Sequence, residues 1–215
     1  MIKSTDIELL PKKVAIFPLT GAVLFPGTQL PLNIFEPRYV QMIDDALASP
    51  GRVIGMIQPS KPGEKTLKKV GCLGRISTFN EAEDSRYLVT LSGTIRFEVT
   101  EELNTTTPYR QIIPDYKQYE PDLKPQKVES IDRSKLLALV KKYLENRKIM
   151  ADWEIIKDTP TEQLINYSGI LVPFTAEEKQ LLLESKTIIT RSHLLEALYQ
   201  SYIFDSPGEK SDQLH

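Results

Sequence analysis

The hydrophobic pattern of the chain changes near residue 120. Before this point, short apolar runs alternate with polar turns, which is typical of half-buried strands. After it, apolar residues recur every three or four positions, as they do in amphipathic helices. The pattern predicts an α+β protein in which a mostly antiparallel β-barrel precedes a C-terminal helical bundle. We expect the barrel over residues 1–120, the bundle over residues 121–205 and a polar, disordered tail over residues 206–215.

Several apolar runs in the first part have the length and the flanking turn residues of strands. One helix interrupts them, because Glu36-Pro37 opens an amphipathic stretch that Pro50-Gly51 closes, and proline suits the first helical position. Gly71 and Gly74 indicate a bulge or the close approach of another backbone. Ser92-Gly93-Thr94 is expected to join two strands. The expected strands cover residues 14–17, 29–35, 52–58, 70–79, 86–91, 95–99 and 109–119.

The second part contains recognisable helix starts and stops. Thr159-Pro160-Thr161-Glu162 and Thr175-Ala176-Glu177-Glu178 both have the sequence of a capping box, the first with proline at the first helical position. Pro173 ends the helix that lies between them. The inner face of the last helix is expected to consist of Leu194, Leu195, Leu198 and Tyr202.

Charge and cysteine content restrict the classes of protein that fit. The chain carries 27 basic and 29 acidic residues and a net charge of −2, so it has no general attraction for nucleic acid or for an anionic membrane. No apolar run approaches the roughly 20 residues of a membrane span, and the N-terminus lacks the apolar core of a signal peptide. The single cysteine, Cys72, excludes an internal disulfide and suits a reducing compartment. These features predict a cytoplasmic protein.

The segment from Val14 to Tyr39 is dense in prolines and large apolar side chains. With the residues that follow it, this segment resembles the N-terminal substrate-binding domain of the ATP-dependent Lon protease family. The resemblance covers most of the chain and is weaker in the C-terminal helices. It implies a PUA-like β-barrel followed by a helical part, and a role in binding protein substrates. The matching segments are Phe17-Pro18-Leu19, Pro26-Gly27, Pro31 to Tyr39, Asp44 to Leu47, Ile54 to Pro59, Gly71 to Gly74 and Leu91 to Gly93.

The chain departs from a complete Lon protease in ways that bear on catalysis. It has no GxxxxGK[ST] phosphate-binding loop, and its helical part leaves no room for a protease module with a Ser-Lys pair. The histidines, His193 and His215, together with one cysteine, are too few for a zinc site. Cys72 lies in an apolar strand and is expected to behave as a small hydrophobe. We therefore expect a free-standing domain that is not an enzyme, with no catalytic residue, metal or cofactor.

Candidate peptide contacts lie in the segment that carries the resemblance, and two interpretations stay open for them. The apolar residues form either core or a partly exposed groove. Glu36 and Arg38 form either a helix cap and salt bridge or a cleft in which Arg38 holds a peptide carboxylate or carbonyl. Because micromolar affinity needs about −8 kcal/mol and a buried large apolar side chain gives roughly 1.5–3 kcal/mol, a groove must take several side chains. The candidates are Phe25, Pro26, Phe35, Glu36, Arg38 and Tyr39.

The leading hypothesis is a non-catalytic module that binds unfolded or extended segments of other proteins, alone or beside a separate ATPase or protease. The second hypothesis is RNA binding, because PUA-like barrels resemble RNA-modification domains. The near-neutral charge argues against it, although one loop gathers four lysines that could contact phosphates. The third hypothesis is a hydrolase with an unrecognised site. The loop lysines are Lys61, Lys65, Lys68 and Lys69.

Overall fold

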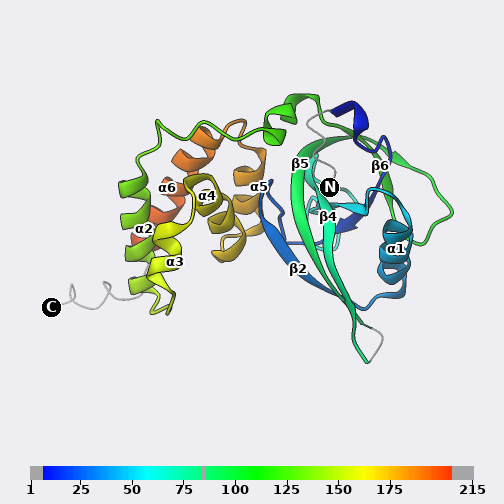
Figure 1. Ribbon diagram of the computed structural model, residues 1–215, viewed down its shortest axis with the longest axis horizontal. Coiled ribbons are helices and arrows are strands. Elements are labelled where there is room, and N and C mark those ends of the chain that lie inside the picture. The colour runs from blue at the N-terminus through cyan, green and yellow to red at the C-terminus, as the bar shows by residue number, and fades with distance from the viewer. Residues whose placement is uncertain (1–6, 84–85, 205–215) are drawn as a thin grey trace.

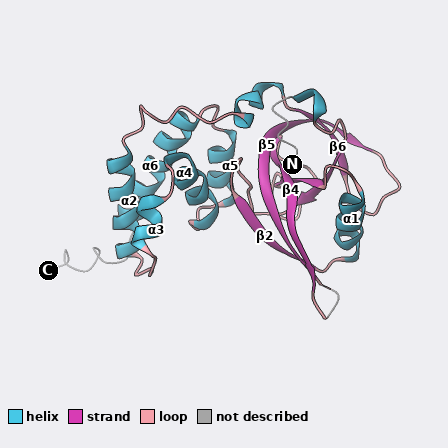
Figure 2. Ribbon diagram, in the orientation of Figure 1, coloured by secondary structure: helices cyan, strands magenta, loops and turns pink. Residues whose placement is uncertain are grey.

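The computed structural model describes residues 7–83 and 86–204, and it places a β-barrel beside a group of helices (Figure 1). Figure 2 shows the strands gathered on one side and most helices on the other. The expected α+β class and the order of barrel and helices are therefore confirmed. The expected tail over residues 206–215 lies outside the described residues. The strands are β1 (Val14–Pro18), β2 (Gln29–Ile34), β3 (Val53–Ile57), β4 (Val70–Glu81), β5 (Tyr87–Leu103) and β6 (Gln111–Asp115).

The strands form one sheet in the order β2-β5-β4-β3-β1-β6. β1 and β3 pair in parallel, and the other pairs are antiparallel. β6 also pairs with the C-terminal part of β5, which returns the sheet to a strand already in it. β2 pairs with the N-terminal part of β5 and has no second strand neighbour among the described residues. The barrel is consequently not strictly closed.

β5 is a single long strand where the sequence predicted two strands joined at Ser92-Gly93-Thr94. Gly93 marks a close approach of two backbones, because a Cβ there would lie 2.0 Å from the carbonyl oxygen of Phe25. The Gly93 N–H donates to the Thr28 carbonyl at 2.9 Å, and the Gly27 N–H donates to the Gly93 carbonyl at 3.0 Å. The predicted turn is therefore wrong, since the glycine makes room for the segment that precedes β2.

Gly71 and Gly74 confirm the other glycine prediction. The register between β4 and β5 shifts between Leu73 and Gly74, which marks an irregularity of the bulge type. A Cβ on Gly71 would lie 2.5 Å from the carbonyl oxygen of Met56 and equally close to the Phe97 ring. Both glycines are required where the sheet bends and its layers approach closely.

The helices confirm most, but not all, of the expected elements. α1 (Pro37–Ala48) begins at the expected proline and packs against β1 and β3. α3 is an additional helix that the periodicity did not predict, and η2 crosses the expected boundary at residue 120. The other helices are η1 (Ile7–Leu9), η2 (Lys117–Leu123), α2 (Arg133–Asn146), α3 (Trp153–Asp158), α4 (Thr161–Leu171), α5 (Ala176–Glu184) and α6 (Ile188–Phe204).

Two local predictions in the helical part are wrong and one is confirmed. Thr175 and Glu178 form the expected reciprocal capping box of α5. Pro160 is instead the residue before α4, whose start has no side-chain cap, and the Thr159 hydroxyl donates to the Ile155 carbonyl of α3. In α6, Leu195 is buried as expected, but the inward face also carries Arg191, Ser192, Glu196, Tyr199 and Ile203, whereas Leu194, Leu198 and Tyr202 are only half-buried.

A buried ion pair joins the barrel to the helices. Arg96 of β5 contacts Asp122 of η2 at 2.8 Å, and the two side chains are 4% and 6% exposed. The Arg96 guanidinium also donates to the carbonyl oxygens of Leu183 and Ser185, at the end of α5, at 2.9 and 2.6 Å. One arginine thus fixes a strand, the connecting segment and a helix end to one another.

A second arginine occupies the same junction, and within residues 7–83 and 86–204 no Asp or Glu side chain forms an ion pair with it. Arg191 of α6 donates to the Leu182 carbonyl at 2.9 Å and to the Asn166 side-chain oxygen at 2.6 Å. Its guanidinium lies 4.8 Å from the centre of the Phe25 ring, while the Asn166 amide donates to the Pro26 carbonyl. Burial lowers the pKa of Arg191 to about 9. Phe25 and Pro26 are therefore part of the contact between the barrel and the helices.

Candidate peptide-binding face

The six residues predicted to contact a peptide occupy two separate places. Phe25 is fully buried and Pro26 is buried, both at the junction between barrel and helices. Their burial favours the core interpretation, and their role as peptide contacts stays a prediction. Phe35, Glu36 and Arg38 lie at the corner between β2 and α1, where Phe35 is 66% exposed. The structure therefore does not bring the six into one groove.

Arg38 and Glu36 form the expected ion pair. The Arg38 Nε and Nη2 atoms donate to the same Glu36 oxygen at 2.9 and 2.7 Å. Glu36 precedes α1, but its side chain caps no backbone N–H, so the expected side-chain cap is wrong. The Arg38 guanidinium also lies 4.5 Å from the centre of the Tyr39 ring. The cation is thus held at the surface, with its charge partly neutralised by Glu36.

Tyr39 is the inward-facing member of this corner. It is 7% exposed and meets the Phe17 ring edge-on, with the ring centres 4.4 Å apart. Burial raises the pKa of its hydroxyl. Tyr39 therefore packs α1 onto the barrel and offers its ring to Arg38 rather than to solvent.

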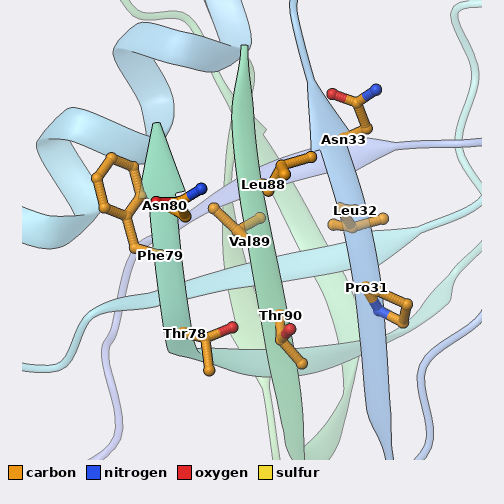
Figure 3. Close-up of a pocket in the computed structure, with 9 residues that line it drawn as sticks. All are labelled: Pro31, Leu32, Asn33, Thr78, Phe79, Asn80, Leu88, Val89 and Thr90. Atoms are coloured by element: carbon orange, nitrogen blue, oxygen red, sulfur yellow. The ribbon is translucent and has the colours of Figure 1, made fainter. Parts of the chain in front are cut away.

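Next to this corner, β2, β5 and β4 present an open sheet surface (Figure 3). Leu88 of β5 lies directly between Asn33 of β2 and Asn80 of β4 in the strand register. Because residues directly opposite one another share a face of the sheet, all three point to the same side. Leu88 is 45% exposed, which identifies this side as the outer one. We call this surface the sheet face; it consists of Pro31, Asn33, Thr78, Asn80, Leu88 and Thr90.

A shallow hollow of about 450 Å³ lies over the sheet face. Figure 3 shows Leu88 on the middle strand, with the two asparagines on the flanking strands. Phe79 lies opposite Val89 in the strand register and so on the other side of the sheet, where its ring meets that of Tyr87 edge-on with the ring centres 4.8 Å apart. Phe35 directly follows β2 and continues the outward alternation of Pro31 and Asn33. Phe35, one of the predicted contacts, therefore extends the exposed surface at this end of the barrel.

The two asparagines give the sheet face its chemistry. Neither the Asn33 nor the Asn80 side chain has a hydrogen-bond partner among the described residues. An asparagine amide both donates and accepts, as a peptide group does. The residues are separated by two strand spacings, about 9–10 Å, which is close to the span of three residues of extended chain. The face can therefore hold an extended backbone at two points and bury a side chain against Leu88.

The free edge of β2 is poorly suited to adding a further strand. The Gln29 N–H at this edge donates to the hydroxyl of Tyr167 in α4 at 3.2 Å. Residues two apart in a strand direct their N–H groups to the same edge, and Pro31 has none to offer. Proline at an edge prevents pairing with another chain. A peptide would consequently be held by the sheet face and not by this edge.

Polar side chains on α1 and in the lysine-rich loop bond to neighbouring residues. The Tyr87 hydroxyl donates to Asp44 at 3.0 Å, and the Tyr109 hydroxyl donates to Asp45 at 2.6 Å. These bonds tie α1 to the strand ends, and burial together with the bond to Asp45 raises the pKa of Tyr109 to about 12. In the lysine-rich loop, Lys61 pairs with Glu64 at 3.7 Å. The two aspartates therefore hold α1 against the barrel through hydrogen bonds at its surface.

Cys72 is fully buried, and its burial raises the pKa of the thiol far above the ordinary range. It is therefore a packed side chain and not a nucleophile, as expected. His193 is exposed on α6. Within residues 7–83 and 86–204, no three His, Cys, Asp or Glu side chains are grouped so that they could hold a metal ion.

The family model of the ATP-dependent protease La (LON) substrate-binding domain matches residues 13–200. The chain belongs to this family. It is 28% identical to the Lon protease of Flavobacterium johnsoniae over 183 residues, which are 82% of this chain and 22% of that protein. It is 27% identical to Lon protease 2 of Myxococcus xanthus over 195 residues, which are 87% of this chain and 23% of that protein. The chain thus spans less than a quarter of the length of these relatives.

Solved structures agree on the fold. The Lon N-terminal domain protein from Xanthomonas campestris superposes with a TM-score of 0.62 at 21% identity, over 86% of this chain and 97% of that one. The N-terminal domain of the Mycobacterium avium complex Lon protease gives a TM-score of 0.63 at 19% identity, over 90% of this chain and 99% of that one. In the part of the chain that the structure describes, no helix is both long and apolar enough to span a membrane.

The sequence did not point to the residues that make up the sheet face. Asn33 is an ordinary polar position in an expected strand, Asn80 falls just after the strand expected over residues 70–79, and Leu88 is one apolar residue among many. Asparagine is depleted in strands, so two asparagines that face outward on the strands flanking β5 are unusual. Their alignment with Leu88 depends on the register of three strands, which no local pattern determines.

Proposed function

We propose that this chain is a non-catalytic module that binds extended, apolar-containing segments of other proteins on the sheet face. The observation that supports this function most strongly is the exposed side chain of Leu88. It lies between the side-chain amides of Asn33 and Asn80, which have no hydrogen-bond partner among the described residues. Membership of a family of substrate-binding domains supports the same function. The amides hold the peptide backbone, while Leu88 and the neighbouring Phe35 cover its apolar side chains.

The expected affinity is modest. Burying large apolar side chains gives roughly 1.5–3 kcal/mol each. Each hydrogen bond between an asparagine side chain and the peptide backbone adds about 0.5–1.5 kcal/mol. Ordering a flexible segment costs about 2–5 kcal/mol. Leu88 and Phe35 are already partly covered, which reduces the free energy that each gains on binding. We therefore expect dissociation constants in the micromolar to millimolar range, which suit transient contact with many different segments.

The relatives indicate where a bound segment goes next. The Flavobacterium johnsoniae and Myxococcus xanthus matches are Lon proteases. We propose that the sheet face holds a segment for an ATPase and protease of this kind, which carry out the chemistry. Recognition by shape and backbone contacts would let the module accept clients of varied sequence.

Binding to a model protein that can be prepared in an unfolded and in a folded form tests this function. Leu88→Asp places a charge at the centre of the sheet face, and about tenfold weaker binding is expected, which corresponds to ~1.4 kcal/mol. Leu181→Asp is the matched control, because Leu181 is a leucine of similar exposure, 54%, on α5. The folded form of the same model protein should not bind.

The salt dependence separates peptide binding from the RNA alternative. Capture on an apolar face with neutral amides should change little between low and high salt. Binding of RNA by the lysine-rich loop should weaken steeply, because phosphate contacts release counterions. Equal loss of binding in Leu88→Asp and Leu181→Asp, or binding of RNA alone, would contradict the proposed function.

A further inference from the structure

The outer side of β2, β5 and β4 extends one row beyond the sheet face, and this row contains an arginine. Gln29 of β2 pairs with Ser92 of β5, and Ser92 pairs with Arg75 of β4. Thr90 of the sheet face precedes Ser92 by two residues on the same strand, and residues two apart share a face. Arg75 therefore lies on the same side of the sheet as the sheet face, whose own side chains are all uncharged.

Unlike other arginines at the barrel surface, Arg75 is not paired with a carboxylate in the described part of the chain. Its side chain forms neither an ion pair nor a hydrogen bond with residues 7–83 or 86–204. By contrast, Arg38 pairs with Glu36, and Arg110 pairs with Glu102. The positive charge of Arg75 is thus available to a segment that lies on this side of the sheet.

The surroundings of Arg75 favour an ionic contact inside a longer segment. Arg75 is half-buried, and its cross-strand neighbours, Ser92 of β5 and Val53 of β3, are neutral. Water and salt screen a contact with a half-buried charge less than a contact with a fully exposed one. Because β3 continues the sheet beyond Arg75, the arginine does not mark an end at which a chain terminus would be held. It suits an acidic side chain within a client segment.

The strand register sets the spacing that a client needs. Leu88 and Ser92 mark the two rows on β5 and are four residues, or about 13 Å, apart. Arg75 lies one strand to the side, so the direct distance from Leu88 is about 14 Å. Four residues of extended chain span about this length. A segment with an apolar side chain on Leu88 therefore reaches Arg75 with a residue about four positions away.

We propose that this surface selects extended segments in which an acidic side chain lies about four residues from an apolar one, and that Arg75 binds the carboxylate. The inference rests on the proposed function and names the class of segment that is bound. An arginine can donate two parallel hydrogen bonds to a carboxylate, which also fixes the end of the segment that lies toward Arg75. A lysine in the same place brings two positive charges together and weakens binding.

Binding of three short labelled peptides, followed by fluorescence anisotropy, tests the proposal. Their ends are blocked, and each has a central leucine with glutamate, glutamine or lysine four positions before and after it. The glutamate peptide should bind about three- to tenfold more tightly than the glutamine peptide, somewhat more than a fully exposed ion pair gives. The lysine peptide should bind most weakly. High salt should reduce the advantage of the glutamate peptide and leave the glutamine peptide unchanged.

Substitutions of Arg75 identify the group that recognises the charge. Arg75→Gln should give the glutamate and glutamine peptides equal affinity, without changing the affinity of the glutamine peptide. Arg75→Glu should reverse the order, so that the lysine peptide binds most tightly. Arg147→Gln is the control for net charge, because Arg147 is an exposed arginine directly after α2, and this variant should keep the preference for glutamate.

Equal binding of the glutamate and glutamine peptides to the unmodified chain would overturn the proposal, as would a preference that survives Arg75→Gln. Tighter binding of a peptide that ends in a free carboxylate at the fourth position would also overturn it, because a chain end would then be recognised. The glutamine peptide reports separately on the proposed function, since its binding should weaken in Leu88→Asp whatever the effect of charge. Absence of binding by all three peptides would contradict the proposed function as well.

Discussion

Single residues decide how the barrel and the helices hold together. Arg96 and Asp122 form a buried ion pair, and Arg96 also donates hydrogen bonds to two carbonyl groups at the end of α5. Asp122→Ala leaves the guanidinium buried without its counter-charge, so we expect a loss of about 3–5 kcal/mol in the free energy of unfolding. Urea denaturation measures it. Glu102→Gln, at the more exposed pair with Arg110, should cost only about 0–1 kcal/mol, and similar losses in both variants would contradict this account.

Gly93 provides a second test at the residue scale. A Cβ at this position would lie 2.0 Å from the Phe25 carbonyl oxygen, so Gly93→Ala must displace a backbone. We expect a destabilisation at or above the usual 1–3 kcal/mol of overpacking, measured as a lower thermal midpoint. At Gly51 the nearest atom would be 3.6 Å away, and Gly51→Ala should be nearly neutral. Equal effects would show that Gly93 is not constrained by this contact.

The same glycine shows what local sequence can and cannot determine. Gly93 between polar residues has the composition of a turn, and only the segment that precedes β2 explains why it lies within a strand. Phe25 is a similar case, because the local sequence around an apolar residue does not show whether its side chain lines a groove or fills a core. Its contact with Arg191 joins residues far apart in the chain. Such positions depend on tertiary contacts and not on local propensity.

At the scale of elements, local signals served well where one residue type fixes the backbone. Pro37 begins α1, and Thr175 with Glu178 caps α5, both as predicted. The composition of the sheet face was not predictable, because Asn33, Leu88 and Asn80 meet only through the register of β2, β5 and β4. The short α3 was also missed, since it has too few turns to show a period.

α3 should be the least stable helix of the helical part. It has six residues, buries none of them and carries the only tryptophan of the chain. Helices this short are not stable without packing, and few buried contacts lower the free energy of local opening. We expect the amides of residues 153–158 to exchange with solvent faster than those of α2 and α4. Protection equal to that of α2 would contradict this prediction.

For the whole molecule, buried tyrosines predict sensitivity to alkaline pH. Burial is the main cause that raises the pKa of Tyr119, Tyr199 and Tyr202 to about 12 each, as it does for Tyr109. The ordinary value is about 10. The neutral hydroxyls therefore stabilise the folded state fully below about pH 10, and this contribution is lost as the pH rises to about 12.

Thermal unfolding across this interval measures the effect. The midpoint should fall steadily between about pH 10 and about pH 12, and Tyr199→Phe should reduce the slope. Arg191, whose pKa burial lowers, acts in the opposite direction but is one group against four. A midpoint that stays constant over the interval would contradict the burial of these hydroxyls.

NMR titration with an unfolded model protein shows whether the sheet face binds extended protein segments. If it does, the side-chain amide signals of Asn33 and Asn80 and the methyl signals of Leu88 shift together and saturate. The signals of Leu181, on α5, should not move. Shifts confined to residues of α2, α3 and α4, or no shifts at saturating concentration, would contradict binding on the sheet face.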